Sequence, residues 1–378
     1  MRPIRPMTAM RWLVPLGLVG MLVGGAMSTR AAPPDSPHPL PQAHPPHLAP
    51  QARGARLQLA VAPSGELADA YAGQLAYTPD GKQWLAGEQR EITVYEGLRR
   101  VRTIGNVWLD SEDTLAVSRD GKRLSAGPRI YDFADGKELF VARGDELSEH
   151  AEPGWEVAAA VLSPDQAQCL AWLKYFPSRC CRDRGHRDSP SFKPASPLFA
   201  IDTATYKAAP LPIESSLGEH RALAASERWF VVGGVAHRAA VFDRRTLARV
   251  ATLQDDGAWY SFAFSRDGHT LVGVHLGRWL VAYDTERFTR RARIEVLPDG
   301  KWISALALHP AWPVAAVSGW DGVLRLYSIA PGDEGRLLWS RELGQASALA
   351  FSPRGDELLC AVPGSPKNRI LRFTVTAK

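Results

Sequence analysis

The sequence predicts an all-β protein, a seven-bladed β-propeller closed by its own N-terminal strand. Three observations support this fold class. A strand–turn–strand unit recurs along most of the 378 residues, 32 glycines and 29 prolines interrupt the chain throughout, and no apolar stripe of helical period extends over a useful length. Hydrophobic residues make up 45% of the chain and charged residues 22%, so a large core can form.

Each copy of the repeat has an alternating apolar strand, a turn similar to Ser/Thr-Pro-Asp-Gly, a second strand, and a third strand that ends in an aromatic and an acidic residue. The first copy has its turn at 78–81 and ends its third strand with Tyr95-Glu96. Equivalent turn positions are 78, 118, 163, 226, 265, 309 and 352, which lie 39 to 45 residues apart except for one step of 63. This period matches a four-stranded propeller blade, and the longer step contains an insertion at about 174–197.

The turn recurs with the same residue types because the backbone geometry of a tight turn requires them. Proline fixes φ at the corner, and glycine accepts the positive φ that follows it. The acid after each aromatic can accept backbone N–H groups of the next turn. We therefore interpret these acids as structural and not as catalytic residues.

The two ends of the repeat region complement each other. The last repeat stops after its third strand, and the alternating segment 57–62 precedes the first repeat. Pairing this segment with the last repeat would supply the missing outer strand and protect an edge that would otherwise aggregate. The sequence therefore predicts closure of the ring by its N-terminal strand.

The repeat pattern resembles the WD40 and related YVTN-type propeller families over about residues 56–378. The Trp-Asp dipeptide of that family is replaced here by pairs such as Tyr131-Asp132, Phe242-Asp243 and Tyr283-Asp284, and the usual Gly-His pair is missing. The resemblance implies the fold without assigning a subfamily. It also implies that partners bind the face that carries the loops before the first strand and between the second and third strands.

The first 32 residues have the features of a secretory signal peptide. Arg2, Arg5 and Arg11 precede and flank an apolar run at 12–23, and small residues follow it. The run is shorter than the ~20 residues of a membrane span, so we expect a periplasmic or secreted protein with no membrane span after cleavage; an uncleaved anchor is the alternative. The proline-rich residues 33–55 predict a disordered linker, whose three histidines are interpreted as linker residues and not as metal ligands.

Aromatic and basic residues gather at the loops of the implied binding face. Tryptophan and arginine are frequent anchors of binding surfaces, and the alternative for the tryptophans is packing between blades. The basic insertion carries six Lys or Arg residues against two Asp and would suit an anionic partner, with a solvated loop as the alternative. The binding candidates are Trp155, Trp259, Trp302, Trp320, Arg238, Arg278, Arg182 and Arg184.

The four cysteines predict one disulfide candidate. Cys169 and Cys360 fall on second strands of blades that are not neighbours, so a bond between them is unfavourable and both are expected to be buried thiols. The vicinal pair Cys180 and Cys181 is the remaining candidate in an oxidising compartment. Together with His186 these cysteines match no zinc-binding spacing, so no metal is expected.

The sequence carries no catalytic signature. It has neither a Gly-x-Ser-x-Gly elbow nor a phosphate-binding loop, and we expect no cofactor. Its 45 basic and 40 acidic residues do not indicate nucleic acid. We therefore predict an extracytoplasmic, monomeric propeller that binds a protein or an anionic cell-envelope component through one face. The alternative is an exported enzyme, lactonase-like or quinoprotein-dehydrogenase-like, with convergent acids and histidines at its channel mouth.

Overall fold

The computed structural model describes residues 57–70, 72–88, 90–107, 109, 114–142, 155–175, 198–213, 222–234, 238–255, 257–298, 300–364 and 368–378. All of them belong to one unit, Gln51–Lys378. The predicted signal peptide, the linker and most of the insertion lie outside the described residues. Within the described part, no helix has the length and apolar character needed to cross a membrane.

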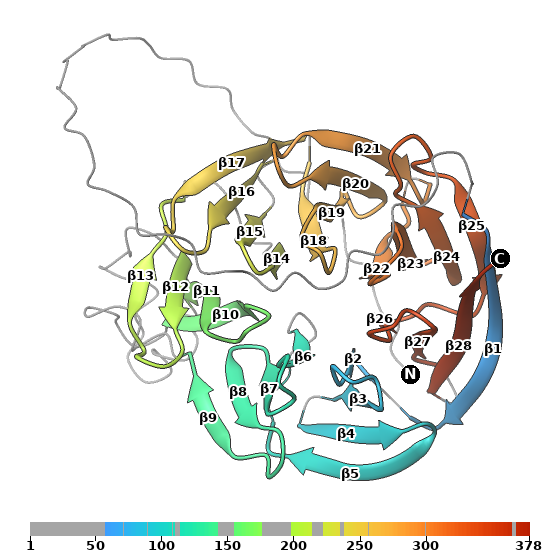
Figure 1. Ribbon diagram of the computed structural model, residues 1–378, viewed down its shortest axis with the longest axis horizontal. Helices are drawn as coiled ribbons and strands as arrows, with labels where there is room; N and C mark the ends of the chain where they lie inside the picture. The colour runs from blue at the N-terminus through green and yellow to red at the C-terminus, as the bar shows by residue number, and fades with distance from the viewer. Residues whose placement is uncertain are drawn as a thin grey trace, which may run out of the picture. The chain divides into compact units, whose positions relative to one another are not determined.

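Seven four-stranded antiparallel sheets surround a central opening, so the predicted seven-bladed propeller is confirmed (Figure 1). The inner strands are β2 (Gln74–Tyr77), β6 (Leu115–Val117), β10 (Trp155–Leu162), β14 (Ala222–Ala225), β18 (Trp259–Phe264), β22 (Ile303–Leu308) and β26 (Ala348–Phe351). The second strands are β3 (Gln83–Gly87), β7 (Arg123–Ala126), β11 (Gln168–Tyr175), β15 (Trp229–Gly233), β19 (Thr270–His275), β23 (Val314–Gly319) and β27 (Glu357–Val362).

The third and outer strands complete the blades. The third strands are β4 (Glu91–Glu96), β8 (Arg129–Asp132), β12 (Leu198–Asp202), β16 (Arg238–Asp243), β20 (Trp279–Asp284), β24 (Val323–Ser328) and β28 (Arg369–Ala377). The outer strands are β5 (Arg99–Gly105), β9 (Glu138–Val141), β13 (Ala208–Pro210), β17 (Arg249–Gln254), β21 (Arg290–Glu295), β25 (Leu337–Glu342) and, in the seventh blade, β1 (Leu59–Ala68). Strand β11 continues to Tyr175, so the predicted insertion begins inside a strand.

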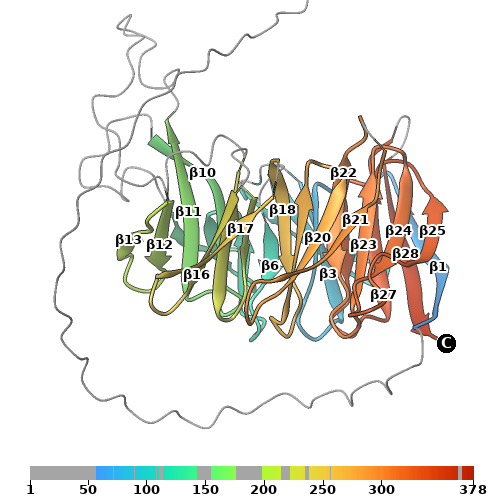
Figure 2. The same cartoon turned by 90° about the horizontal axis from the view of Figure 1, so that it is seen from above.

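The strands run between two faces of the ring (Figure 2). One face, here called the turn face, carries the turns from first to second and from third to outer strand, and all of its residues are described. The opposite loop face carries the connections from second to third strand and from one blade to the next. The internal segments that lie outside the described residues connect at the loop face, whereas residues 1–56 join the described chain at the turn-face end of β1.

The ring closes as predicted, through antiparallel pairing of β1 with β28. The register runs from Leu59 opposite Ala377 to Ala68 opposite Arg369, with an irregularity between Pro63 and Gly65. The strand is thus longer than the segment 57–62 inferred from alternation. Inner strands β2 and β26 also contact each other, so the first and last blades meet as neighbours elsewhere in the ring do.

Alternation places each side of a strand against a different neighbouring blade. Trp84 of β3 packs with Leu359 of the seventh blade, whereas the next residue, Leu85, packs with Leu124 of the second blade. Both faces of each sheet are therefore buried, and removing a blade would expose apolar surface on two others.

Four of the seven turns between first and second strands, in the first, second, third and fifth blades, share one hydrogen-bond pattern. In the first blade, the Thr78 hydroxyl donates to Asp80 at 2.7 Å and accepts the backbone N–H of Gln83 at 3.0 Å. Gly81 supplies the positive φ of 72°. The hydroxyl of Thr78 lowers the pKa of Asp80, which is mostly exposed. The aspartates that end four of the third strands, Asp132, Asp202, Asp243 and Asp284, accept backbone donors as predicted; Asp132, for example, accepts from Ala134 at 2.8 Å.

His309 replaces the hydroxyl residue in the sixth blade. Like the hydroxyl, it both accepts backbone N–H groups of its turn and donates one hydrogen bond. Its Nδ1 accepts the backbone N–H groups of Ala311 at 3.1 Å and Trp312 at 2.9 Å, so the proton resides on Nε2, which donates to the carbonyl of Gly355 at 3.0 Å. The ring is buried and stacks on Trp312 at 4.2 Å. Burial lowers the pKa of His309 to about 4.

The closure predicts a difference between two adjacent residues of the N-terminal segment. Leu59 is buried in the cluster shared by the sixth and seventh blades, whereas Gln58 is exposed. We expect Leu59→Ala to lower the unfolding free energy by ~2–4 kcal/mol and Gln58→Ala to change it by less than ~0.5 kcal/mol. Deletion of 57–62 should lower the melting temperature further. Urea and thermal unfolding measure both effects, and an unchanged melting temperature in the deletion would contradict closure by this strand.

The neutral His309 predicts a stability that falls in acid. Its pKa is lower in the folded than in the unfolded state, so the unfolded chain binds more protons between pH ~6.5 and ~4. The contribution is fully present above about pH 6.5 and falls by up to ~3 kcal/mol as the pH drops to about 4. Urea unfolding at several pH values should show this loss in the natural protein and a smaller one in His309→Ser, which carries the hydroxyl found in the other blades. Equal pH dependence of the two proteins would refute the assignment.

Candidate functional site

The loop face carries an exposed aromatic surface between the fifth and sixth blades. It consists of Tyr260, Leu276, Trp302 and Trp320. Trp320 is 53% exposed and Leu276 39% exposed. The rings of Tyr260 and Trp302 meet edge-on at 4.8 Å, and those of Trp302 and Trp320 lie 6.1 Å apart. This aromatic surface contains two of the tryptophans proposed from the sequence as binding residues.

Backbone contacts fix the two tryptophans in place. The N–H of Trp320 donates to the carbonyl of Trp302 at 2.8 Å, and the N–H of Ile303 donates to the carbonyl of Gly277 in the neighbouring blade. Gly277 has φ of 69°, and a Cβ added there would come within 2.4 Å of the Trp302 ring. Because glycine has no side chain, the backbone of the fifth blade packs directly against the Trp302 ring. This close contact fixes the position of the ring.

Trp259 has a different role from the one predicted. It is fully buried, stacks on Phe262 at 5.0 Å and packs near His275 and Tyr283. Strand β18 has a register shift between Trp259 and Ser261, so Trp259 turns into the core while Tyr260 reaches the aromatic surface. The packing alternative thus applies to Trp259, and its neighbour Tyr260 is half-buried at the aromatic surface.

The other binding candidates from the sequence differ in whether the structure places them on the loop face. Arg278 lies half-buried, 3.6 Å from Glu295 and over the ring of Trp279, so its charge already has a partner within the fold. Arg238 is exposed at the start of β16 on the loop face. Trp155 begins β10 at the same face. Arg182, Arg184, Cys180 and Cys181 lie outside the described residues.

The two cysteines on second strands are buried free thiols, as predicted. Burial raises the pKa of the Cys169 and Cys360 thiols to about 12, so the reactive thiolate is suppressed. Neither belongs to a candidate site. Among the described side chains, no three His, Cys, Asp or Glu residues converge in a way that would hold a metal ion.

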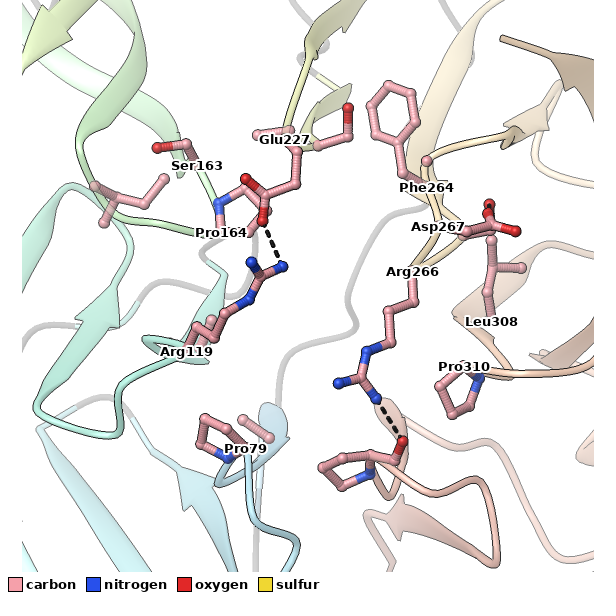
Figure 3. A pocket seen from close by; sticks show the side chains of 18 of the residues that line it. Pro79, Arg119, Ser163, Pro164, Glu227, Phe264, Arg266, Asp267, Leu308 and Pro310 are labelled. Carbon is pink, nitrogen blue, oxygen red and sulfur yellow. Dashed lines mark hydrogen bonds and ion pairs between the residues drawn. The ribbon is translucent and has the colours of Figure 1, made fainter. Parts of the chain in front are cut away.

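The turn face has a cavity that the sequence prediction missed. It occupies about 710 Å³ at the mouth of the central channel (Figure 3). The residue after each first-strand turn position lines it in all seven blades. These seven form what we term the rim: Pro79, Arg119, Pro164, Glu227, Arg266, Pro310 and Pro353. The sequence signal was available, because aligned turns show which residue occupies this position in each repeat.

A second set of seven residues lies one step inside the rim. The residue before each turn position also lines the cavity in every blade. Apart from the tyrosine hydroxyl, these side chains are apolar. They form what we term the inner ring: Tyr77, Val117, Leu162, Ala225, Phe264, Leu308 and Phe351. The cavity therefore changes from apolar inside to polar at its opening.

Two arginines reach into the opening from opposite sides (Figure 3). Arg119 makes an ion pair with Glu227 at 2.7 Å, across the turn of the intervening blade, and both side chains are largely exposed. Arg266 donates to the carbonyl of Pro353 at 2.7 Å. A guanidinium has five N–H donors, so most of the donors of Arg266 are left available, and its charge is not matched by any ion pair with the described carboxylates.

A buried arginine fixes part of this opening. Arg244 is 7% exposed and donates to both carboxylate oxygens of Asp165, at 2.9 and 3.1 Å. It also donates to the carbonyls of Ser226 and Glu227, at 3.0 and 2.8 Å. The third and fourth blades are therefore tied together beside the ion pair of Arg119 with Glu227.

The comparisons with known proteins identify the architecture. No protein-family model and no curated protein matches the sequence. The structure is similar to the β-propeller domain of Cps50 (Swd1) from Myceliophteria thermophila, with a TM-score of 0.63 and 15% identity, covering 84% of this chain and 100% of that one. At this identity the likeness shows a WD40-like propeller fold alone. Because 1783 chains of known structure match, the fold does not select a function.

The tie at Arg244 predicts a contrast between two neighbouring arginines. Arg244→Ala would remove the donor from the carbonyls of Ser226 and Glu227 and the cationic partner from Asp165, and we expect a loss of ~2–4 kcal/mol in unfolding free energy. Arg245 is exposed, so Arg245→Ala should change it by less than ~0.5 kcal/mol. Urea unfolding of both variants tests this. Similar stability of the two would show that the tie contributes nothing.

Proposed function

We propose that this propeller acts outside the cytoplasm as a protein-binding scaffold, and that the aromatic surface on the loop face is its contact site. The observation that supports it is the pair of the exposed Trp320 and the half-buried Trp302, held by backbone hydrogen bonds in a fixed arrangement. Binding energy at protein interfaces concentrates in such aromatic anchors, and rigid aromatic side chains lose little entropy when they are covered.

The chemistry of the surroundings suggests what the partner presents. Trp320 and Leu276 offer apolar area, and the exposed Lys301 lies next to Trp302. A protein segment with an apolar side chain flanked by an acidic residue would match this arrangement. The basic segment 174–197 is expected to add to the same face, which keeps an anionic cell-envelope component as the other partner class. The export proposal derives from residues 1–32.

Affinity capture with matched surface variants tests the proposal. The tagged full chain is incubated separately with envelope and cytosolic extracts, and bound proteins are quantified by mass spectrometry. Trp320→Ser removes an exposed anchor on the aromatic surface, and Leu337→Ser removes a similarly exposed side chain from an outer strand, where 48% of Leu337 is accessible. We expect Trp320→Ser to weaken a specific partner by about thirtyfold and Leu337→Ser to leave it bound.

Further outcomes separate the parts of the proposal. Deleting 176–197, which spares strand β11, should weaken an anionic partner and leave an apolar contact at Trp320 intact. Capture that is equal for Trp320→Ser and the natural protein would reject the aromatic surface as the contact site. A specific partner found only in the cytosolic extract would reject the extracytoplasmic role.

A further inference from the structure

We propose that the turn-face mouth of the channel binds one molecule that carries a single carboxylate on an apolar body. The carboxylate would lie at the rim between Arg266 and Arg119, and the body would rest on the inner ring. This site lies on the opposite face from the aromatic surface. The two proposals can therefore fail independently.

The cavity has the size and the graded lining of a small-molecule site. Its volume of about 710 Å³ falls in the range of ligand pockets, which are mostly apolar and hold a few polar groups that orient the ligand. The inner ring supplies apolar walls from all seven blades, including Phe264 and Phe351, and the four rim prolines add rigid apolar edges. An apolar body is favoured inside because it displaces water from these walls.

The rim supplies one cation that the fold leaves unmatched. Arg119 is paired with Glu227, whereas among the described residues the Arg266 guanidinium has a hydrogen bond to the neutral carbonyl of Pro353 and no ion pair. A planar guanidinium binds a carboxylate with two parallel hydrogen bonds. The rim holds two arginines and one glutamate, Arg119, Arg266 and Glu227, so its seven positions carry one net positive charge, which favours a monoanion over a neutral ligand.

The remaining charged groups of the cavity lie outside the rim. Asp267 accepts from the Ser265 hydroxyl at 2.5 Å and from the backbone of His269 at 3.0 Å, and its carboxylate points away from the opening between Arg119 and Arg266 (Figure 3). Arg228 stacks on Trp229 and lies 3.9 Å from Asp243. The other charged group is the exposed carboxylate of Glu286, on the turn that follows strand β20.

Binding to the full chain can be measured by ligand-observed NMR with two pairs of probes. The first pair is 4-phenylbutyrate and its uncharged amide. The second is the N-acetylated peptide Ala-Ala-Phe as free acid and as C-terminal amide. We expect the acids to bind about tenfold more tightly than their amides. Binding of the small acid alone indicates a free metabolite-like ligand, and binding of the peptide acid alone indicates the end of a protein chain.

Two rim variants should change the affinity in opposite directions. Arg266→Gln removes the unmatched cation and should weaken the acid about tenfold, whereas Glu227→Gln removes a competing carboxylate from Arg119 and should tighten it severalfold. Arg287→Gln, an exposed arginine on the same face outside the cavity, should have no effect. All three side chains are exposed, and equal melting temperatures would confirm intact folds.

Several results would overturn the proposal. Equal binding of acid and amide would remove the role of the arginines. A change of the same sign in Arg266→Gln and Glu227→Gln would show that charge at the rim does not control affinity. Absence of binding by every probe at millimolar concentration would show that the cavity is not a site for this class of ligand.

Discussion

Pairing between the two ends of the chain is the constraint on which the rest of the structure depends. Strand β1 is the outer strand of the seventh blade, where it pairs with β28 so that residue 59 lies opposite residue 377. Closure then aligns seven turns around one opening. The contacts of Arg119 with Glu227 and of Arg266 with Pro353 each join two blades that are separated by a third, so both depend on how the blades curve around the opening.

The two faces divide the chemistry of the molecule. On the turn face a hydroxyl residue and an acid satisfy the backbone of four of the seven first turns, and the residue between them lines the mouth of the channel. On the loop face the connections differ in length and composition, and neighbouring blades contribute to one surface, as Gly277 and Trp302 do. A narrow, repetitive opening and a broad, irregular surface therefore coexist on one scaffold.

The sequence predicted the fold well because its determinants are local and repeated. Turn residues, alternation and a spare strand are readable one blade at a time, and the structure confirms each. Side-chain exposure was harder to predict, since a single register shift in β18 decides that Trp259 is buried and Tyr260 is not. Arg278 was assigned to the surface, but Glu295 of an outer strand already pairs with it. Contacts across the channel depend on ring geometry, which no local pattern contains.

The seven equivalent rim positions have a consequence for how such a protein can change over time. Each position lies inside a turn whose backbone is held by the side chains of other residues, so a substitution there changes the lining of the opening. Four of the positions hold proline, which also fixes φ at the corner, whereas Arg119, Glu227 and Arg266 present charged side chains. Single mutations at these three charged positions could therefore change the preference of the opening for charge at little risk to folding.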